Sequence, residues 1–434
     1  MNTMRILWIT HDLFECFLPY VKGNPTKGGS WIAPLFYSMK EQPGVKLGSV
    51  TPVVNGESQK KEIDGITYYS IPMKKNGNTK DMSEEQVSGY LWAINDFKPD
   101  IIHVHGTEKN FGLLRKYVDA RTPIVCSIQG IILPYYDSLK LSVAAIDIEK
   151  YRSFKNRLGR GGVNFTLKKW EHYSLIEREI YRINNYFIGR TTWDKAQLMS
   201  LNPGAAYFHG EELLRAEFYT QRWAIDRCER HRIFVSSAAY PIKGFHVLLK
   251  AAAMLKQEYP DIKVVAPLAT IDTKSSHLRD YLVAEDYANY LKSEIKKLNL
   301  EDNILFKKRL SAKEMALEYG KAHVFVLPSF IENSPNALGE SMMMGVPSVA
   351  SSVGGVSSIV KDNESSLLFP SGDSAFLAYQ IKRIFSEDTL AMKISREAQN
   401  IAHRRHNVEQ TTQQYLTIYS HIIEQHHENT TYTL

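Results

Sequence analysis

The chain of 434 residues carries 44% apolar residues, 23% charged residues and a formal net charge of +6. This length allows two domains with separate cores, and the composition is that of an ordinary globular protein. The sequence contains no apolar run that approaches the ~20 residues of a membrane-spanning helix.

The N-terminal stretch and the cysteines favour a cytoplasmic protein. Asp12 and Glu15 come too early for a signal peptide, so residues 5–10 are expected to form a first strand. The three cysteines lie far apart and lack metal-ligand spacing, which indicates reduced thiols. The mild positive charge permits an anionic ligand or membrane surface but requires neither.

The first elements have the pattern of a doubly wound α/β domain. An apolar run at residues 4–10 is followed by a loop that contains Gly28 and Gly29, and then by a helical pattern over 31–39. The glycine pair would let the backbone approach a ligand closely. The loop is not a GxGxxG sequence, however, and an ordinary turn explains it as well.

A buried strand is expected at residues 99–106, with His103 and His105 on one face because strand side chains alternate. A metal site would need a third ligand, and the sequence shows none. Buried, hydrogen-bonded histidines or a ligand contact at the strand end are the favoured interpretations. Another parallel-type strand at 122–130 ends in Gln129 and Gly130.

Residues 150–170 hold seven Lys or Arg and no acid, interleaved with Tyr151, Phe154, Leu158 and Phe165. A solvated helical face with long basic side chains explains this pattern. A surface that lies on anionic lipid headgroups explains it equally well. Helices at 170–182 and 192–200 then complete the first domain.

A second series of alternating strands and helices begins at residue 232 and runs to the helix at 389–403. We therefore expect two doubly wound parallel sheets that face each other, with a ligand at the carboxyl ends of their strands. The predicted domains are 1–215 and 216–407. The amphipathic helix at 408–424 is expected to pack back on the first domain.

The stretch 329–355 combines a helix start with two acids. Ser334 is the expected N-cap and Pro335 the first helical residue. Glu332 precedes this helix, and Glu340 lies on its third turn. A helix N-terminus with a carboxylate on each side suits a phosphorylated, hydroxyl-rich ligand. The backbone N–H groups expected to face this ligand belong to Asn336, Ala337 and Leu338.

These motifs stand in the order and spacing of a known family. Lys243-Gly244, the strand at 324–329, Glu332-x7-Glu340 and Gly354-Gly355 resemble the retaining glycosyltransferases of family four, also called group 1. Residues 99–106 and the Gly28-Gly29 pair are similar to the first domain of that family. The run ENSPNALGESM especially resembles enzymes that build bacterial surface polysaccharides. The resemblance implies the GT-B fold, with two Rossmann-like domains facing across a cleft.

Members of this family transfer a sugar from a nucleoside diphosphate sugar to an acceptor hydroxyl. The resemblance implies that Glu332 and Lys243 are catalytic. Glu332 would lie beside the transferred sugar, and Lys243 would neutralise the departing diphosphate. The implied donor-binding residues are Glu340, which would accept the ribose hydroxyls, together with Gly28, Gly29, Gly244, Arg309, Leu310, Ser334, Asn336, Ala337 and Leu338. The implied acceptor-side residues are His103, His105 and Gln129.

Three positions depart from the family pattern. Ala238 replaces a phosphate-binding arginine, Gln129 replaces a histidine, and Ser357-Ser358 replaces a Glu or Pro. The sequence has no Asp-x-Asp pair of the kind that holds a metal in the other major glycosyltransferase fold. We therefore expect no bound metal and no bound cofactor, with the nucleotide sugar as co-substrate.

The leading hypothesis is a cytoplasmic retaining glycosyltransferase with a glycan or lipid-linked glycan acceptor, peripheral on the inner face of the cell membrane. A nucleotide-sugar epimerase or a phosphorylase on the same architecture is an alternative within enzymes. A non-catalytic sugar- or nucleotide-binding subunit of a polysaccharide assembly complex is an alternative outside them. Nucleic-acid binding is not expected, because the basic cluster is local and belongs to no recognisable module.

Overall fold

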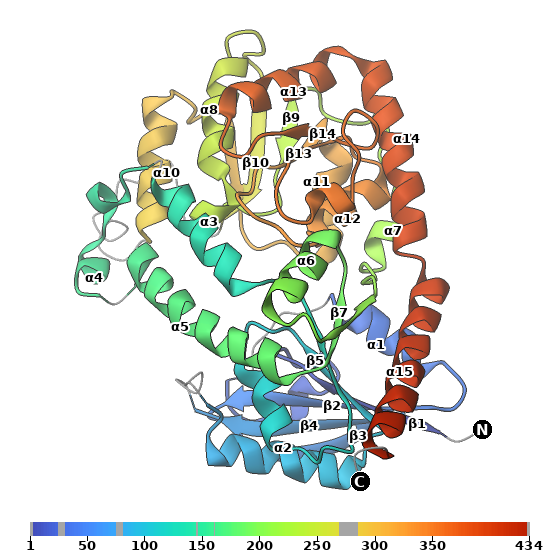
Figure 1. Cartoon of the computed structure of the whole chain (residues 1–434). Coiled ribbons are helices and arrows are strands. Elements are labelled where there is room, and N and C mark those ends of the chain that lie inside the picture. Colours follow the sequence, from blue (N-terminus) through green and yellow to red (C-terminus); the bar gives the residue numbers. More distant parts are fainter. Residues whose placement is uncertain are drawn as a thin grey trace. The chain divides into compact units, whose positions relative to one another are not determined.

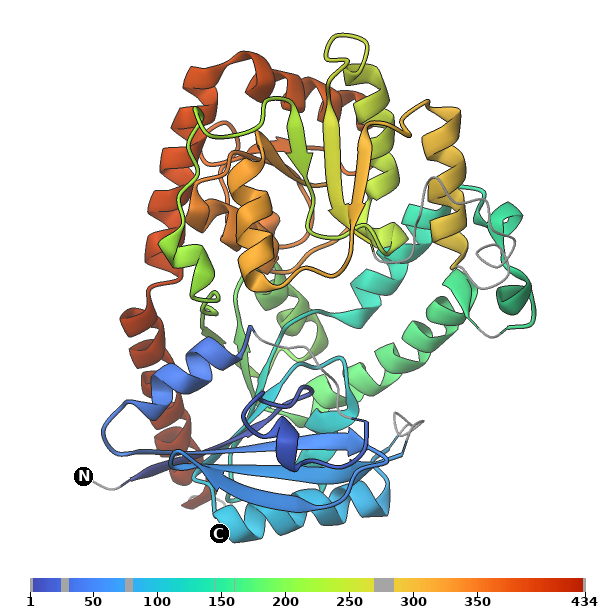
Figure 2. The same cartoon turned by 180° about the vertical axis from the view of Figure 1, so that it is seen from behind.

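The computed structural model describes residues 3–24, 31–74, 81–144, 146–159, 161–268 and 285–431 (Figures 1 and 2). The chain divides into two compact units. Unit 1 comprises Met1–Ile132, His172–Leu213 and Arg405–Leu434, and unit 2 comprises Leu133–Glu171 and Leu214–Arg404.

Unit 1 is built on an eight-stranded sheet in the order β3-β4-β2-β1-β5-β6-β7-β8. The pairing of β3 with β4 is antiparallel, and the other pairings are parallel. The strands are β1 (Met4–Ile9), β2 (Val45–Val54), β3 (Gln59–Ile63), β4 (Ile66–Met73), β5 (Ile101–His105), β6 (Ile124–Ser127), β7 (Tyr186–Gly189) and β8 (Ala206–His209).

Helices cover both faces of this sheet. Strand β1 shows why: Leu7 and Ile9 belong to one apolar cluster, whereas Ile6 and Trp8 belong to another. A strand that is apolar on both faces must be buried on both. The helices and 3₁₀ turns that carry unit 1 residues are η1 (Leu18–Tyr20), α1 (Ala33–Lys40), α2 (Glu84–Phe97), η2 (Asn110–Lys116), α5 (Gly162–Ile183), α6 (Thr192–Leu201) and α15 (Val408–Thr431).

Unit 2 contains a six-stranded parallel sheet in the order β11-β10-β9-β12-β13-β14. Counted from β9, this is the order 3-2-1-4-5-6 of a doubly wound nucleotide-binding fold. The strand order therefore reverses between β9 and β12. The strands are β9 (Arg232–Phe234), β10 (Lys263–Pro267), β11 (Ile304–Lys307), β12 (Val324–Leu327), β13 (Ser348–Ser351) and β14 (Leu367–Phe369).

Helices also cover the sheet of unit 2, and one continuous apolar cluster forms its core. The helices and 3₁₀ turns are α3 (Ile132–Ala144), η3 (Ile148–Tyr151), α4 (Phe154–Arg157), α7 (Glu217–Thr220), η4 (Pro241–Lys243), α8 (Phe245–Leu255), α10 (Asp286–Lys297), α11 (Ala312–Lys321), α12 (Asn336–Met344), η5 (Val356–Ser358), α13 (Ser374–Ser386) and α14 (Asp388–Arg405).

The segment 133–171 is grouped differently from the sequence-based division, which placed it in the first domain. It belongs to unit 2, because Ile146, Ile148 and Val163 are buried in the core of that unit. Helix α15 contributes Tyr415, Tyr419 and other side chains to the core of unit 1. Among the described residues, no helix combines the length and apolar character needed to cross a membrane.

Candidate active site

The candidate residues of unit 2 lie where its strand order reverses. The segment that follows β9 carries Lys243, and the segment that follows β12 carries Glu332. In open α/β sheets, ligands bind outside the carboxyl ends of the strands at this reversal. The topology thus brings together two residues that are 89 positions apart in the chain.

Lys243 and Glu332 form an ion pair, with 2.6 Å between Lys243 Nζ and Glu332 Oε1. Ser329 Oγ donates a second hydrogen bond of 2.7 Å to the same carboxylate oxygen. Glu332 is 5% exposed, so these contacts compensate for the removal of its charge from water. The Lys243 side chain is 31% exposed and can still reach a bound molecule.

Two glycines allow the backbone to pass close to this pair. Gly244 has a φ of +68°, and a Cβ at this position would lie 1.8 Å from the Pro328 carbonyl oxygen. Gly354 has a φ of +50°, and a Cβ there would lie 2.0 Å from the Glu332 carbonyl oxygen. Both positions therefore require glycine on grounds of φ and of space.

Glu340 lies on α12 in a second polar cluster. Its Oε1 accepts a hydrogen bond of 2.7 Å from Arg215 Nη2, and Tyr319 Oη donates a longer one of 3.4 Å to Oε2. Burial raises the pKa of the Glu340 carboxyl, whereas Arg215 and the Tyr319 hydroxyl lower it. Arg215 is thus the main group that stabilises the charged form.

The start of α12 differs from its prediction by one residue. Pro335, and not Ser334, is the N-cap, and no side chain caps the helix. The Leu338 N–H donates to the Pro335 carbonyl at 3.0 Å, so this donor is already used within the turn. Proline at the N-cap is compatible with the extended backbone found there, because its φ of −70° is the value that its ring fixes.

An apolar cavity of about 350 Å³ opens beside the ends of β9, β10 and β11. Its lining includes Tyr240, Leu268 and Tyr287, with Arg309 at one side. This volume is at the lower end of the range of small-molecule sites. Leu310, the neighbour of Arg309, packs against the core instead.

Comparison with known proteins shows what unit 2 is similar to. Residues 220–401, which make up most of unit 2, match the family described as glycosyl transferases group 1. Over these residues, unit 2 is similar to the group 1 glycosyl transferases. A curated relative, the D-inositol 3-phosphate glycosyltransferase of Arthrobacter sp. (strain FB24), is 29% identical over 157 residues. The match covers 36% of this chain and spans 35% of the length of that relative.

Solved structures are similar over nearly the whole chain. The sucrose-phosphate synthase of Thermosynechococcus elongatus aligns with a TM-score of 0.72 at 16% identity, covering 97% of this chain and 99% of that one. HepE of Anabaena, solved in complex with UDP-glucose, aligns with a TM-score of 0.64 at 16% identity, covering 96% and 99%. The predicted GT-B fold, with two Rossmann-like domains, is therefore confirmed.

Of the predicted residues outside unit 2, Gly28 and Gly29 lie outside the described residues. His103 is fully buried, with Nδ1 2.6 Å from Tyr419 Oη and Nε2 2.5 Å from Ser127 Oγ. Since both ring nitrogens are engaged inside unit 1, the structure favours the interpretation of His103 as a buried, hydrogen-bonded histidine over an acceptor contact.

His105 is the last residue of β5, and Gln129 follows β6. The His105 ring packs in tilted contact with Trp8 and with His103, at centroid distances of 4.0 and 3.9 Å. Burial, together with His103, holds the pKa of His105 well below its usual range. The Gln129 carbonyl accepts a hydrogen bond of 3.2 Å from Arg190 Nη2.

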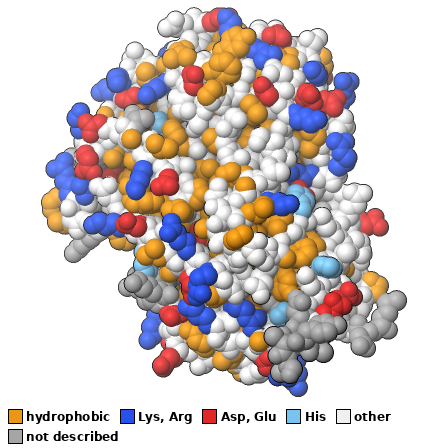
Figure 3. Space-filling view, viewed as in Figure 1, with side chains coloured by type: hydrophobic (Ala, Val, Ile, Leu, Met, Phe, Trp, Pro, Cys, Tyr) orange, Lys and Arg blue, Asp and Glu red, His pale blue; other side chains and the backbone are white. Residues whose placement is uncertain are grey.

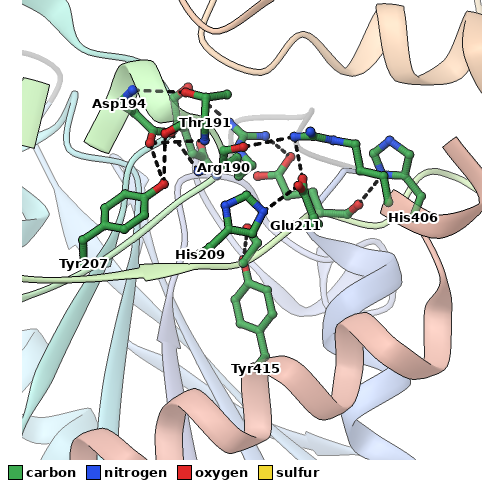
Figure 4. A network of polar contacts seen from close by, with 12 residues as sticks. Arg190, Thr191, Asp194, Tyr207, His209, Glu211, His406 and Tyr415 are labelled. Atoms are coloured by element: carbon green, nitrogen blue, oxygen red, sulfur yellow. Dashed lines mark hydrogen bonds and ion pairs between the residues drawn. The ribbon is translucent and has the colours of Figure 1, made fainter. Parts of the chain in front are cut away.

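Arg190 belongs to a polar network in unit 1 that the sequence did not reveal (Figure 4). It forms a 2.6 Å ion pair with Glu212, and Arg405 forms another of 2.6 Å with Glu211. Figure 4 shows Arg190 and Glu211 near His209 of β8 and Tyr415 of α15.

Three residues that contact the predicted acids were not predicted from the sequence: Arg215, Tyr319 and Ser329. Arg215 and Tyr319 lie far from Glu340 in the chain. The contact of Ser329 with Glu332 is close in sequence but becomes apparent only in the fold.

Among the described residues, no group of three or more His, Cys, Asp or Glu side chains is arranged to hold a metal ion.

Proposed function

We propose that this protein is a retaining glycosyltransferase that moves a sugar from a nucleoside diphosphate sugar to a hydroxyl of a glycan or lipid-linked glycan in polysaccharide synthesis. The observation that carries the proposal is the Lys243–Glu332 pair, 2.6 Å apart where the strand order of unit 2, the part similar to group 1 glycosyl transferases, reverses. Transfer of a sugar from a diphosphate needs a cation at the leaving group and hydrogen-bond acceptors at the sugar.

Lys243 would move from Glu332 to the donor diphosphate, whose charge grows as the glycosidic bond breaks. Glu332 would then accept hydrogen bonds from the hydroxyls of the sugar and stabilise positive character at the anomeric carbon. Glu340 would accept both ribose hydroxyls. The backbone at the start of α12 would supply donors to the diphosphate or the sugar, with Asn336 and Ala337 in front.

The base of the donor would lie in the apolar cavity beside Arg309, as a flat ring suits its apolar lining. The complex of HepE with UDP-glucose makes a uridine nucleotide the first donor to test. We propose that no metal takes part, because Lys243 and a helix N-terminus supply positive potential where the diphosphate would lie.

We propose that His105 and Gln129 of unit 1 contact the acceptor. Nε2 of His105 has no hydrogen-bond partner among the described residues. A neutral imidazole can accept or donate one hydrogen bond at this atom, which suits a sugar hydroxyl.

Donor binding and turnover test the proposal together. Thermal shift with a panel of nucleoside diphosphate sugars should show several degrees of stabilisation by one donor. With that donor, Lys243→Met should lower kcat by about a hundredfold, the effect of losing one transition-state contact. Lys263→Met, an exposed lysine at the opposite end of β10, is the matched control and should leave kcat unchanged.

Each outcome discriminates between hypotheses. Stabilisation by a nucleotide sugar without turnover on any glycan acceptor would support the non-catalytic binding subunit. Full activity of both Lys243→Met and Glu332→Gln would remove the active-site assignment.

We further propose that the protein is cytoplasmic and contacts the inner face of the cell membrane through residues 150–170. Three large apolar side chains of this segment are exposed: Phe154 in α4 by 60%, Leu158 directly after α4 by 57%, and Phe165 in α5 by 52%. Figure 3 shows apolar and basic side chains, with acidic ones among them, on the side of unit 2 where α4 lies. This mixture suits an anionic lipid surface.

The exposure of these side chains is not due to a loose segment. Asp286, which is 3% exposed, accepts hydrogen bonds from Asn156 Nδ2 at 2.6 Å and from the Ser153 N–H at 3.3 Å. These contacts fix α4 onto α10 while Phe154 points outward. An anchored helix that exposes large apolar groups is typical of an interaction surface.

Flotation with vesicles tests this contact. The wild-type chain should float with vesicles that contain phosphatidylglycerol and remain below those of phosphatidylcholine alone. The double variant Lys155→Glu, Arg157→Glu should no longer float. The control Lys393→Glu, Arg396→Glu reverses the same charge on exposed positions of α14 and should float normally. Equal flotation of all three proteins would argue against the surface.

A further inference from the structure

Glu340 is held by a side chain that neither the motif nor the family match points to. Arg215 precedes α7, and its Nη2 donates to Glu340 Oε1 at 2.7 Å. The two residues are 125 positions apart in sequence. Of the Arg215 side chain 25% is exposed, compared with 8% of that of Glu340.

The position of Arg215 is itself fixed by packing. Its guanidinium carbon lies 4.9 Å from the centre of the Phe218 ring, a stacking arrangement favourable for arginine. Phe218 is fully buried and meets Tyr319 edge to face at 5.9 Å. The Tyr319 hydroxyl in turn donates to the Ala337 carbonyl at 2.8 Å. The guanidinium and the phenol therefore reach Glu340 from one packed cluster.

Both contacts leave acceptor capacity on the carboxylate. A carboxylate has about four lone-pair sites, and Arg215 uses one of them on Oε1. The single hydroxyl hydrogen of Tyr319 is shared between the Ala337 carbonyl at 2.8 Å and Glu340 Oε2 at 3.4 Å, so Oε2 is only weakly engaged. At least one site on each oxygen remains, which is what a bidentate contact with two neighbouring hydroxyls requires. An unpaired carboxylate at this depth would favour its protonated form, which could accept only one of the two hydroxyls well.

We propose that Arg215 is the positioning residue for ribose recognition: it holds the Glu340 carboxylate ionised and oriented, so that both oxygens can accept the ribose hydroxyls of the donor. This inference rests on the proposed function. Arg215 lies outside the Glu332-x7-Glu340 motif, and it would act on the donor through Glu340.

The charges around Glu340 determine the direction of the pH effect. Arg215 and the Tyr319 hydroxyl favour the ionised form, whereas burial and the nearby Glu217 carboxylate oppose it. Loss of Arg215 therefore raises the pKa of Glu340. Donor affinity of such a variant should improve as the pH rises, because a larger fraction of Glu340 is ionised.

The test compares donor kinetics of the full-length Arg215→Met variant with those of the wild type, using the donor selected by thermal shift. We expect the donor KM to rise about tenfold with kcat unchanged, as for a lost contact made equally in ground and transition state. As the pH rises, the KM of Arg215→Met should fall more steeply than that of the wild type. Arg215→Lys should restore part of the affinity.

Two further variants separate positioning from folding. Arg222→Met changes an exposed arginine in the same segment and should leave the KM unchanged. In a Glu340→Gln background, Arg215→Met should add little, since its effect passes through Glu340.

An unchanged or lower KM in folded Arg215→Met, or a KM that falls no more steeply with pH than that of the wild type, would overturn the role of Arg215 and leave the proposed function intact. Failure of the wild type to bind any nucleoside diphosphate sugar would overturn both.

Discussion

Buried histidines link single residues of this protein to its stability. Burial lowers the pKa of His103 to about 3 and the pKa values of His246, His323 and His406 to about 4. In the unfolded chain a histidine titrates near pH 6.5. The neutral rings therefore contribute stability above that pH, and this contribution is lost as the pH falls toward 4.

At the residue scale, we predict that His103→Gln weakens the acid sensitivity of the protein. In the wild type, unfolding at acid pH lets His103 take up one proton, and the variant lacks this group. The slope of unfolding free energy against pH, between pH 6 and 4.5, should therefore be smaller in the variant by about 1.4 kcal/mol per pH unit. Urea denaturation of wild type and variant across this range measures the slope. The control His421→Gln changes an exposed histidine and should leave the slope unaltered. Parallel curves for His103→Gln would contradict the assignment.

Motif spacing in the sequence could predict some of the candidate site residues and not others. Lys243, Glu332 and Glu340 were proposed from the sequence because their order and spacing resemble a motif of a known glycosyltransferase family. Arg215 and Tyr319 were missed, because no local pattern links them to Glu340. For His103 the sequence left a buried histidine and an acceptor contact open, and its hydrogen bonds to Tyr419 and Ser127 favour the first.

At the scale of elements, the site depends on how closely the end of η4 approaches β12. Gly244 permits that approach, since it has a positive φ and leaves no room for a Cβ beside Pro328. The approach places Lys243 next to Glu332. A change at this glycine should therefore affect stability and activity together.

We predict that Gly244→Ala destabilises the protein by about 2 kcal/mol or more, through backbone strain and displacement of Pro328. Turnover should fall as well, because Lys243 moves with the loop. Thermal unfolding and initial rates measure the two effects. Gly320→Ala on α11 is the matched control: a Cβ there meets nothing within 4 Å, and the change should stabilise by up to about 1 kcal/mol. Equal stability of the two variants would show that the close approach is not needed.

Element boundaries were predicted less accurately than element types. The helix expected to start at residue 170 begins at Gly162, and the N-cap of α12 is one residue later than expected. At α12 the local signals were ambiguous, because Ser334 and Pro335 can each precede a helix. Backbone hydrogen bonds within the fold decide between such starts.

At the scale of the whole molecule, the last part of the chain completes the first unit. Tyr419 of α15 is fully buried, and its hydroxyl meets His103 of β5 at 2.6 Å. The strand β1 presents Ile6 and Trp8 to the same apolar cluster. The core of unit 1 therefore requires residues from both ends of the chain.

We predict that Tyr419→Ala destabilises unit 1 selectively, by about 3–5 kcal/mol, because it leaves a large cavity and an unpaired His103 nitrogen. Hydrogen exchange should show faster exchange in β1 and β5, with β9 and β12 little changed. Thr417→Ala, at an exposed position of the same helix, should change neither. Uniform loss of protection in both units would contradict a unit-specific role for α15.

The sequence by itself determined the fold class, the two-fold succession of strands and helices, and the catalytic candidates of unit 2. It could do so because alternating apolar runs mark strands and helices, and because the ordered motifs of unit 2 resemble those of a known family. Tertiary structure alone decided that 133–171 packs with unit 2, that His103 is a core residue and that Arg215 holds Glu340. These facts depend on burial and on contacts between residues far apart in the chain, for which the sequence carries no periodic or spacing signal.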